Sequence, residues 1–177
     1  MIIYRQATLD DAAALADAQV ESFRTSYRGI YSDTYLDSPA FPKRCQTSWG
    51  RRLGTASEDI VVLVAEEKGE LLGFLRLLLD ESDEWGSCVD SLHVLPSAQR
   101  RGMARHLMSL ASEEAHKQGT HSQIYLWCFA HNTAALAAYT ALDGIRSDVT
   151  QPYPLPDGSE PPAYRFHWLL AHPHTSS

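Results

Sequence analysis

Residues 87–129 constrain the fold of this chain more strongly than any other segment. Residues 87–95 form an apolar run with the composition of a β-strand, and Pro96 follows directly. An apolar set then recurs at the spacing of one helix face, made of Met103, Leu107, Leu110, Ala111 and Ala115. Residues 122–129 are apolar on both faces, which is typical of a strand in the middle of a sheet. The segment therefore predicts a strand, a helix and a central strand in an α/β arrangement.

The remaining segments extend this arrangement in both directions. Strand-like runs are predicted at 2–7, 59–67, 70–80, 144–150 and 163–170. Helices are predicted from Leu9 into the mid-20s, where Thr8 and Asp11 resemble a capping box, and at 43–53 and 131–142. An irregular aromatic segment at 26–44 and a Pro-rich loop at 151–162 connect these elements. The order predicts an α/β, single-domain fold, with a mixed central β-sheet of about six or seven strands flanked by about four helices.

Composition excludes several classes of function. The net charge of −7 argues against nucleic-acid binding. No apolar run approaches the roughly 20 residues that cross a bilayer, so no membrane partner is expected. The N-terminus lacks the pattern of a secretory signal, and the three cysteines are widely spaced, so a cytoplasmic protein with reduced thiols is expected. No metal-ligand spacing is present, and no metal is expected.

The turn that precedes the helix at 102–117 has the features of an anion site. The N–H groups at a helix N-terminus have no intrahelical acceptor, and the helix dipole adds partial positive charge there. Gly102 permits close approach of the backbone, and Arg100, Arg101 and Arg105 add charged donors. A solvated helix start is the alternative on these grounds alone. The spacings of a dinucleotide fingerprint and of a P-loop are both absent.

Residues 99–104, Gln-Arg-Arg-Gly-Met-Ala, match the pattern Q/R-x-x-G-x-G/A. This pattern resembles the acyl-CoA pyrophosphate motif of the GNAT superfamily of N-acetyltransferases. The strand residues Leu92, His93 and Val94 resemble the family's pantetheine-pairing strand, and Asn132, Ala135 and Tyr139 match its N-x-x-A-x-x-x-Y helix. The resemblance implies acetyl-CoA as the acyl donor. It also implies a set of cofactor-binding residues, namely Leu92, His93, Val94, Gln99, Arg100, Arg101, Gly102, Met103, Ala104, Arg105, Asn132, Ala135 and Tyr139.

The resemblance implies one N-acetyltransferase domain at 1–177, in which successive segments have different roles. Residues 1–58 would form the acceptor side. Residues 59–118 would form the hairpin, the cofactor strand and the pyrophosphate-binding helix. Residues 119–171 would carry the Asn/Tyr helix and the last strands, and 172–177 would be a flexible tail.

Tyr139 is the expected general acid near the departing sulfur. It would act either by hydrogen bonding to developing charge or with a lowered pKa. Candidates for the general base are Glu21, Asp90 and His93, with a water chain as an equal alternative. Without the resemblance, Asn132 reads as a helix N-cap and Tyr139 as a buried aromatic residue.

The expected function is acetyl transfer from acetyl-CoA to a primary amine of a small molecule, with a peptide amine as the second choice. The attack would be direct, in a ternary complex. The alternatives are a catalytically idle acyl-CoA-binding sensor on the same fold and a structural domain that binds no nucleotide. Edge strands and the C-terminal strand are places where a homodimer could form.

Three features bear on the acceptor side. The family commonly continues its Tyr helix with Leu-Gly-Phe, whereas this chain has Leu142-Asp143-Gly144-Ile145, so we expect Gly144 to end the helix one place later. Tyr153 in the Pro-rich loop either rims the acceptor pocket or belongs to a rigid surface excursion. An acidic group could attract a cationic amine or be merely solvated; its members are Asp33, Asp37, Glu81, Asp83 and Glu84.

Overall fold

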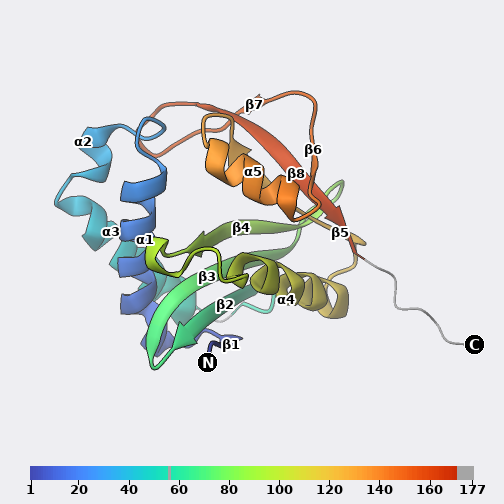
Figure 1. Cartoon of the computed structure of the whole chain (residues 1–177), viewed down its shortest axis with the longest axis horizontal. Coiled ribbons are helices and arrows are strands. Elements are labelled where there is room, and N and C mark those ends of the chain that lie inside the picture. Colours follow the sequence, from blue (N-terminus) through green and yellow to red (C-terminus); the bar gives the residue numbers. More distant parts are fainter. Residues whose placement is uncertain (56, 171–177) are drawn as a thin grey trace, which may run out of the picture.

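The computed structural model describes residues 1–55 and 57–170 and contains one mixed sheet. The strand order is β1-β2-β3-β4-β5-β8-β6, and β7 pairs with β8 (Figure 1). Neighbouring strands are antiparallel except for the parallel pair β4 and β5. The strands are β1 Ile3–Gln6, β2 Ile60–Glu67, β3 Glu70–Ser82, β4 Gly86–Val94, β5 Gln123–Phe129, β6 Ile145–Arg146, β7 Gln151–Pro152 and β8 Pro162–Leu169.

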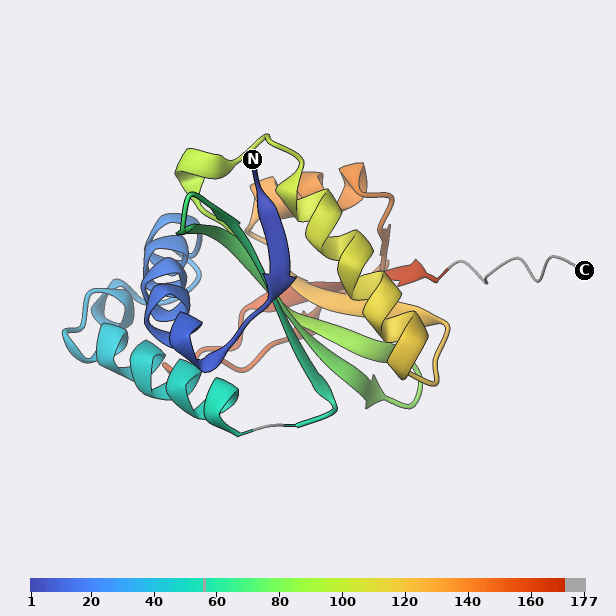
Figure 2. The same cartoon turned by 90° about the horizontal axis from the view of Figure 1, so that it is seen from below.

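Helices cover both faces of the sheet (Figure 2). α1 and α3 lie on one face and α4 on the other, and this layering confirms the predicted α/β fold class. The helices are α1 Ala12–Ser26, α2 Asp33–Leu36, α3 Ala40–Gly54, α4 Met103–Gln118 and α5 Thr133–Ala141. α2 adds a single turn within the segment predicted to be irregular. α3 begins before the predicted Lys43 because Pro42 falls in its first turn, where proline is tolerated.

The C-terminal third departs from the sequence prediction. The strand predicted at 144–150 is reduced to the two residues of β6, and the Pro-rich loop contains β7, which pairs Gln151 with Ala163. Pro152 is tolerated there because this strand lies at the margin of the sheet. The predicted tail at 172–177 lies outside the described residues.

Two apolar cores occupy the two faces of the sheet. Leu77, Leu107 and Phe166 are fully buried in the core beneath α4. Trp49, Phe74 and Leu15 are fully buried in the core beneath α1 and α3. Phe74 and Leu75 are neighbours on β3 that belong to opposite cores, as the alternation of side chains along a strand requires.

β4 and β5 pair over only a short length and then diverge. Their register joins Ser87 to Ile124 and Cys88 to Tyr125, and it continues no further. The diverging part of β4 remains paired with β3, where Leu92 faces Leu75 and Val94 faces Gly73. The opposite backbone edge of β4 is therefore open along residues 89–94.

A β-bulge interrupts β4 within this diverging part. Arg76 pairs with Ser91 and Leu77 with Val89, so Asp90 has no partner on β3. A bulge bends its strand and redirects a side chain. Here it directs a carboxylate, which pairs with Arg76 at 2.6 Å.

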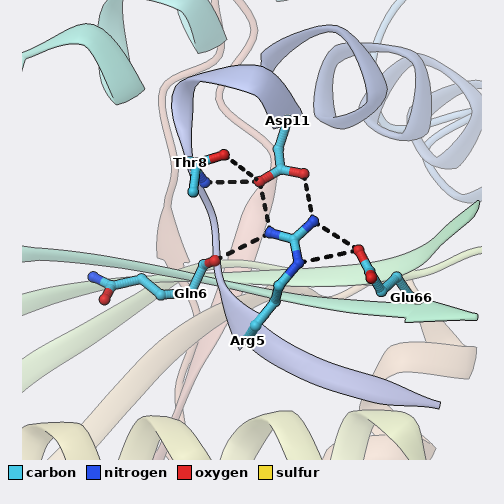
Figure 3. Close-up of polar contacts among 5 residues, drawn as sticks. All are labelled: Arg5, Gln6, Thr8, Asp11 and Glu66. Atoms are coloured by element: carbon cyan, nitrogen blue, oxygen red, sulfur yellow. Dashed lines mark hydrogen bonds and ion pairs between the residues drawn. The ribbon is translucent and has the colours of Figure 1, made fainter. Parts of the chain in front are cut away.

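A partly buried ion network ties the N-terminal strand to the start of the first helix (Figure 3). The Arg5 guanidinium donates to both oxygens of Asp11 at 2.8 Å and to Glu66 on β2 at 2.6 Å. Asp11 also accepts from the Thr8 backbone N–H at 2.7 Å, as the predicted capping signature requires. The hydrogen bond from Arg5 lowers the pKa of Asp11 to about 2.

We predict that Asp11→Asn lowers the free energy of unfolding by about 1 kcal/mol at neutral pH, because a charge-assisted bond to Arg5 is lost. The pKa of Asp11 is lower in the folded state, so its contribution is present above the ordinary value of 3.8 and disappears as the pH falls through about 2. Urea denaturation at several pH values measures this difference. The exposed neighbour Asp10 supplies the control, Asp10→Asn. An equal effect of both substitutions would contradict the prediction.

Candidate active site

A groove of about 580 Å³ lies where β4 and β5 diverge. It is lined by β4, the turn before α4, the first turn of α4, α5 and the C-terminal half of α1. Every cofactor-binding residue predicted from the sequence lines it, with the exception of Arg101. Arg101 pairs instead with Glu67 on β2 at 2.8 Å, which turns its guanidinium away from the groove.

The turn before α4 has the backbone geometry of an anion site. Arg100 and Gly102 both adopt left-handed conformations, with φ of 61° and 79°. Left-handed residues in a turn gather backbone N–H groups into a concavity for anions. No side chain caps the N-terminus of α4. Its first N–H groups therefore remain available to a bound group, and the helix dipole favours negative charge there.

Arg105 connects the first turn of α4 to the end of α5. Its guanidinium donates to the Ala141 carbonyl at 2.7 Å and lies 3.9 Å from Asp143. This bond joins the two helices that border the groove, because α4 carries the anion-binding turn and α5 carries Tyr139.

α5 carries Asn132 and Tyr139 on the border of the groove. The Asn132 side chain accepts the Ala135 N–H at 3.1 Å, which is the N-cap bond expected of asparagine there. Tyr139 is half-buried and packs 5.5 Å from Phe166. Burial raises the pKa of Tyr139, and Cys128 adds to the rise. The phenol therefore stays protonated and can donate a hydrogen bond. Of the two modes expected for Tyr139, hydrogen bonding agrees with this raised pKa, and action through a lowered pKa does not.

The end of α5 differs from the expectation for Gly144. Asp143 adopts the left-handed conformation, with φ of 63°, while Gly144 does not. Gly144 is required for packing instead, because a β-carbon there would lie 2.6 Å from the Trp168 ring. The chain thus leaves the helix through Asp143 and passes closely over β8.

The three base candidates occupy different environments. His93 lines the groove, is only 8% exposed, and its Nδ1 lies 2.7 Å from the Ser22 hydroxyl. Burial lowers the pKa of His93 to about 4, so its imidazole is neutral. Glu21 is exposed on α1 and does not line the groove. Asp90 sits at the bulge beside Arg76, with 28% of its side chain exposed, and like Glu21 it does not line the groove.

The sequence prediction missed the residues of α1 that line the groove, which are Ser22, Ser26 and Tyr27. Ser22 is buried, although it is polar and lies mid-helix. Ser22 and Ser26 are one helical turn apart and therefore share a face. Two small polar residues spaced one turn apart in the C-terminal half of this amphipathic helix were the available signal. Tyr27 follows the helix and packs 5.6 Å from Phe129 on β5.

Comparison with known proteins identifies the class of this fold and site. The family model described as "Acetyltransferase (GNAT) family" matches residues 20–145. The chain belongs to this family and is an acyltransferase that uses acetyl-CoA, which confirms the resemblance seen in the sequence.

Particular relatives agree with this assignment. The uncharacterised N-acetyltransferase YuaI of Bacillus subtilis is 27% identical over 138 residues, covering 77% of this chain and 76% of the relative. The PaiA N-acetyltransferase of Thermoplasma acidophilum, solved with coenzyme A, has a TM-score of 0.71 at 19% identity, covering 95% of this chain and 99% of that chain. The ribosomal-protein-S18-alanine N-acetyltransferase of Escherichia coli has a TM-score of 0.65 at 18% identity, covering 100% and 99%.

Neither a bilayer-crossing helix nor a metal-binding cluster is present among the described residues. Across residues 1–55 and 57–170, no helix combines the length and the apolar character needed to cross a bilayer. The same residues contain no group of three or more His, Cys, Asp or Glu side chains placed to hold a metal ion.

We predict that Gly102→Glu abolishes measurable CoA binding, whereas Arg100→Ala weakens it only a few-fold. At a φ of 79° a side chain strains the turn, and the added carboxylate would oppose an anion. Isothermal titration with CoA measures both effects. Gly50→Ala is the control, since Gly50 has an ordinary φ and nothing within 4 Å of an added β-carbon. An equal loss in Arg100→Ala would show that guanidinium charge, not backbone geometry, dominates.

Proposed function

We propose that this chain transfers the acetyl group of acetyl-CoA to a primary amine of a small molecule, by direct attack in a ternary complex. One observation carries the proposal. A single groove joins the anion-binding turn, the open edge of β4 and the protonated Tyr139. These are the groups that would hold a pyrophosphate, orient an extended amide-bearing arm and meet a leaving thiolate.

The donor half of the site rests on backbone groups. The N–H groups of residues 100–105 would hold the pyrophosphate of the acyl donor. The open edge of β4 at Leu92–Val94 would pair with the amides of the pantetheine arm in the manner of an added strand. Ala134, Ala135 and Ala138 keep the facing side of α5 narrow. Acetyl-CoA would supply the activated thioester.

The chemistry requires a neutral amine and a stabilised leaving group. An alkyl amine has a pKa of about 10.4, so one proton must leave before attack. The amine nitrogen then bonds to the carbonyl carbon, and N–H groups of the open β4 edge near His93 and Val94 would stabilise the oxyanion. The carbon–sulfur bond breaks as Tyr139 donates a hydrogen bond to the sulfur. Full proton transfer from an ordinary phenol to a thiolate is uphill by roughly 2 kcal/mol, so hydrogen bonding is the favoured role.

Among the base candidates, the surroundings of Asp90 support it best. Its carboxylate is held by Arg76 at 2.6 Å and remains partly exposed, at a bulge just before the strand residues assigned to the pantetheine. His93 engages Ser22 and is weakly basic, and Glu21 faces solvent outside the groove. Asp90 would therefore accept the amine proton, directly or through a water molecule.

We predict that Tyr139→Phe lowers kcat by about 100-fold while leaving the affinity for CoA within a factor of two or three, because the ring is retained and only the donor is lost. Release of free thiol from acetyl-CoA measures kcat, and titration with CoA measures affinity. Tyr4→Phe, on β1 and outside the groove lining, is the matched control. An unchanged kcat in Tyr139→Phe would remove its proposed role.

Thiol release across polyamines, amino acids, aminoglycosides and short peptides tests the proposed reaction itself. Turnover of small amines supports it. Turnover of peptides alone would show that the acceptor is a peptide amine and not a small molecule. CoA binding without thiol release for any acceptor would favour the catalytically idle sensor.

A further inference from the structure

A row of side chains crosses the sheet on the face that carries α1 and α3. Asp90 on β4 pairs with Arg76 on β3, and Trp127 on β5 is in register with Arg165 on β8. Leu126 and Cys128 belong to the core beneath α4, so Trp127 between them points to the opposite face. Asp90 and Trp127 each lie two positions beyond the last β4–β5 pair, on opposite sides of the opening where these strands separate. The row therefore continues from the proposed base to Arg165.

Arg165 is a cation held in place without a carboxylate partner. Its guanidinium lies 3.4 Å from the centre of the Trp85 ring and 5.6 Å from that of Trp127. No carboxylate of the described chain lies within 4.0 Å of it. Its Nε is buried with no acceptor among the described residues, while the residue as a whole is partly exposed. Arg76, in contrast, donates to Asp90.

An arginine that packs against two indole rings is suited to binding an anion. The rings restrict the side chain before any ligand arrives, and the fork of terminal N–H groups matches a carboxylate. Burial of Nε against the rings leaves that fork as the accessible part of the guanidinium. The pairing of Arg76 with Asp90 leaves Arg165 as the cation of this row without an anionic partner.

An aromatic wall connects Arg165 to the groove. The Tyr153 ring lies 6.2 Å from Trp127 and 5.6 Å from Phe129, and Phe129 lies 5.6 Å from Tyr27. Tyr27 lines the end of the groove. The Pro-rich loop, through Tyr153, thus contributes to this wall. An apolar segment of a ligand could lie along it while its two ends meet groups of opposite charge.

We propose that Arg165 binds an anionic group of the acceptor, so that the substrate is an amine joined to a carboxylate by an extended spacer. This inference rests on the proposed function, since it places the reactive amine at Asp90. Paired neighbouring strands are about 4.8 Å apart and β4 has already diverged from β5 at Asp90, so two strand spacings, roughly 10 Å, are the least separation of Asp90 and Arg165. That span fits an ω-amino acid or a short peptide with a free C-terminus better than an α-amino acid.

Matched pairs of acceptors test the assignment. One pair is 6-aminohexanoate and hexylamine, and the other is a dialanine peptide and its C-terminal amide. We expect the wild-type kcat/KM to be at least tenfold higher for the carboxylate member of one pair, and the pair that discriminates identifies the source of the carboxylate. Equal values within both pairs would overturn the inference.

Substitution of the arginine provides the second test. We expect Arg165→Gln to lower kcat/KM for the preferred carboxylate to the value of its uncharged counterpart, with hexylamine turnover and CoA affinity unchanged. Arg146→Gln is the control, because Arg146 stacks on Tyr164 at 4.6 Å, and Tyr164 packs against the core of the other face. If the glutamine variant is unstable, Arg165→Lys replaces it in the test. This variant keeps the positive charge and should retain part of the preference for the carboxylate acceptor. An equal loss for both members of a pair would overturn the inference.

Failure of this inference is distinguishable from failure of the proposed function. If amines are acetylated without preference for a carboxylate, the assignment of Arg165 fails and the acetyltransferase reaction stands. If no acceptor in either pair or in the wider amine panel releases thiol while CoA binds, the proposed reaction fails, and the acceptor assignment fails with it.

Discussion

The divergence of β4 and β5 is the constraint on which the rest of the site depends. Backbone N–H and C=O groups inside a protein need partners, yet the parallel pair stops after Cys88 and Tyr125. The open edge of β4 is thereby prepared to bind a ligand that has amides of its own. The start of α4, the helix α5 and the end of α1 surround this opening. The fold therefore places its backbone N–H donors and its apolar side chains where the pairing of β4 with β5 ends.

The two sides of this opening use different physical means. The donor side relies on backbone geometry, through the left-handed Arg100 and Gly102 and the uncapped start of α4. The proposed acceptor side presents side chains instead, namely a carboxylate projected by a bulge and aromatic rings contributed by separate segments. Backbone geometry at a helix start suits one invariant group such as a pyrophosphate. Side chains on loops and strands can be exchanged, which suits an acceptor that differs among members of a family.

The donor side was predictable because its information is local. Residues 99–105 lie in one turn, and Asn132 and Tyr139 lie on one face of one short helix. The acceptor side was not, because Ser22 meets His93 across 71 positions of sequence. Arg101 was predicted with its neighbours, but its contact with Glu67, 34 positions away, decides its direction. The role of Gly144 was predicted wrongly for the same reason, because a glycine is required there by close contact with Trp168, which is distant in the sequence.

By itself the sequence determined the α/β order of elements, the anion-binding turn, the Asn/Tyr helix and hence the acetyltransferase family. These features follow from the spacing of residue types along a strand or a helix, and that spacing can be read directly from the sequence. Only the tertiary structure decided where β4 and β5 separate, that Asp90 occupies a bulge, and that Arg165 packs against Trp85 and Trp127. These features arise from register and packing between distant segments, which no local pattern encodes.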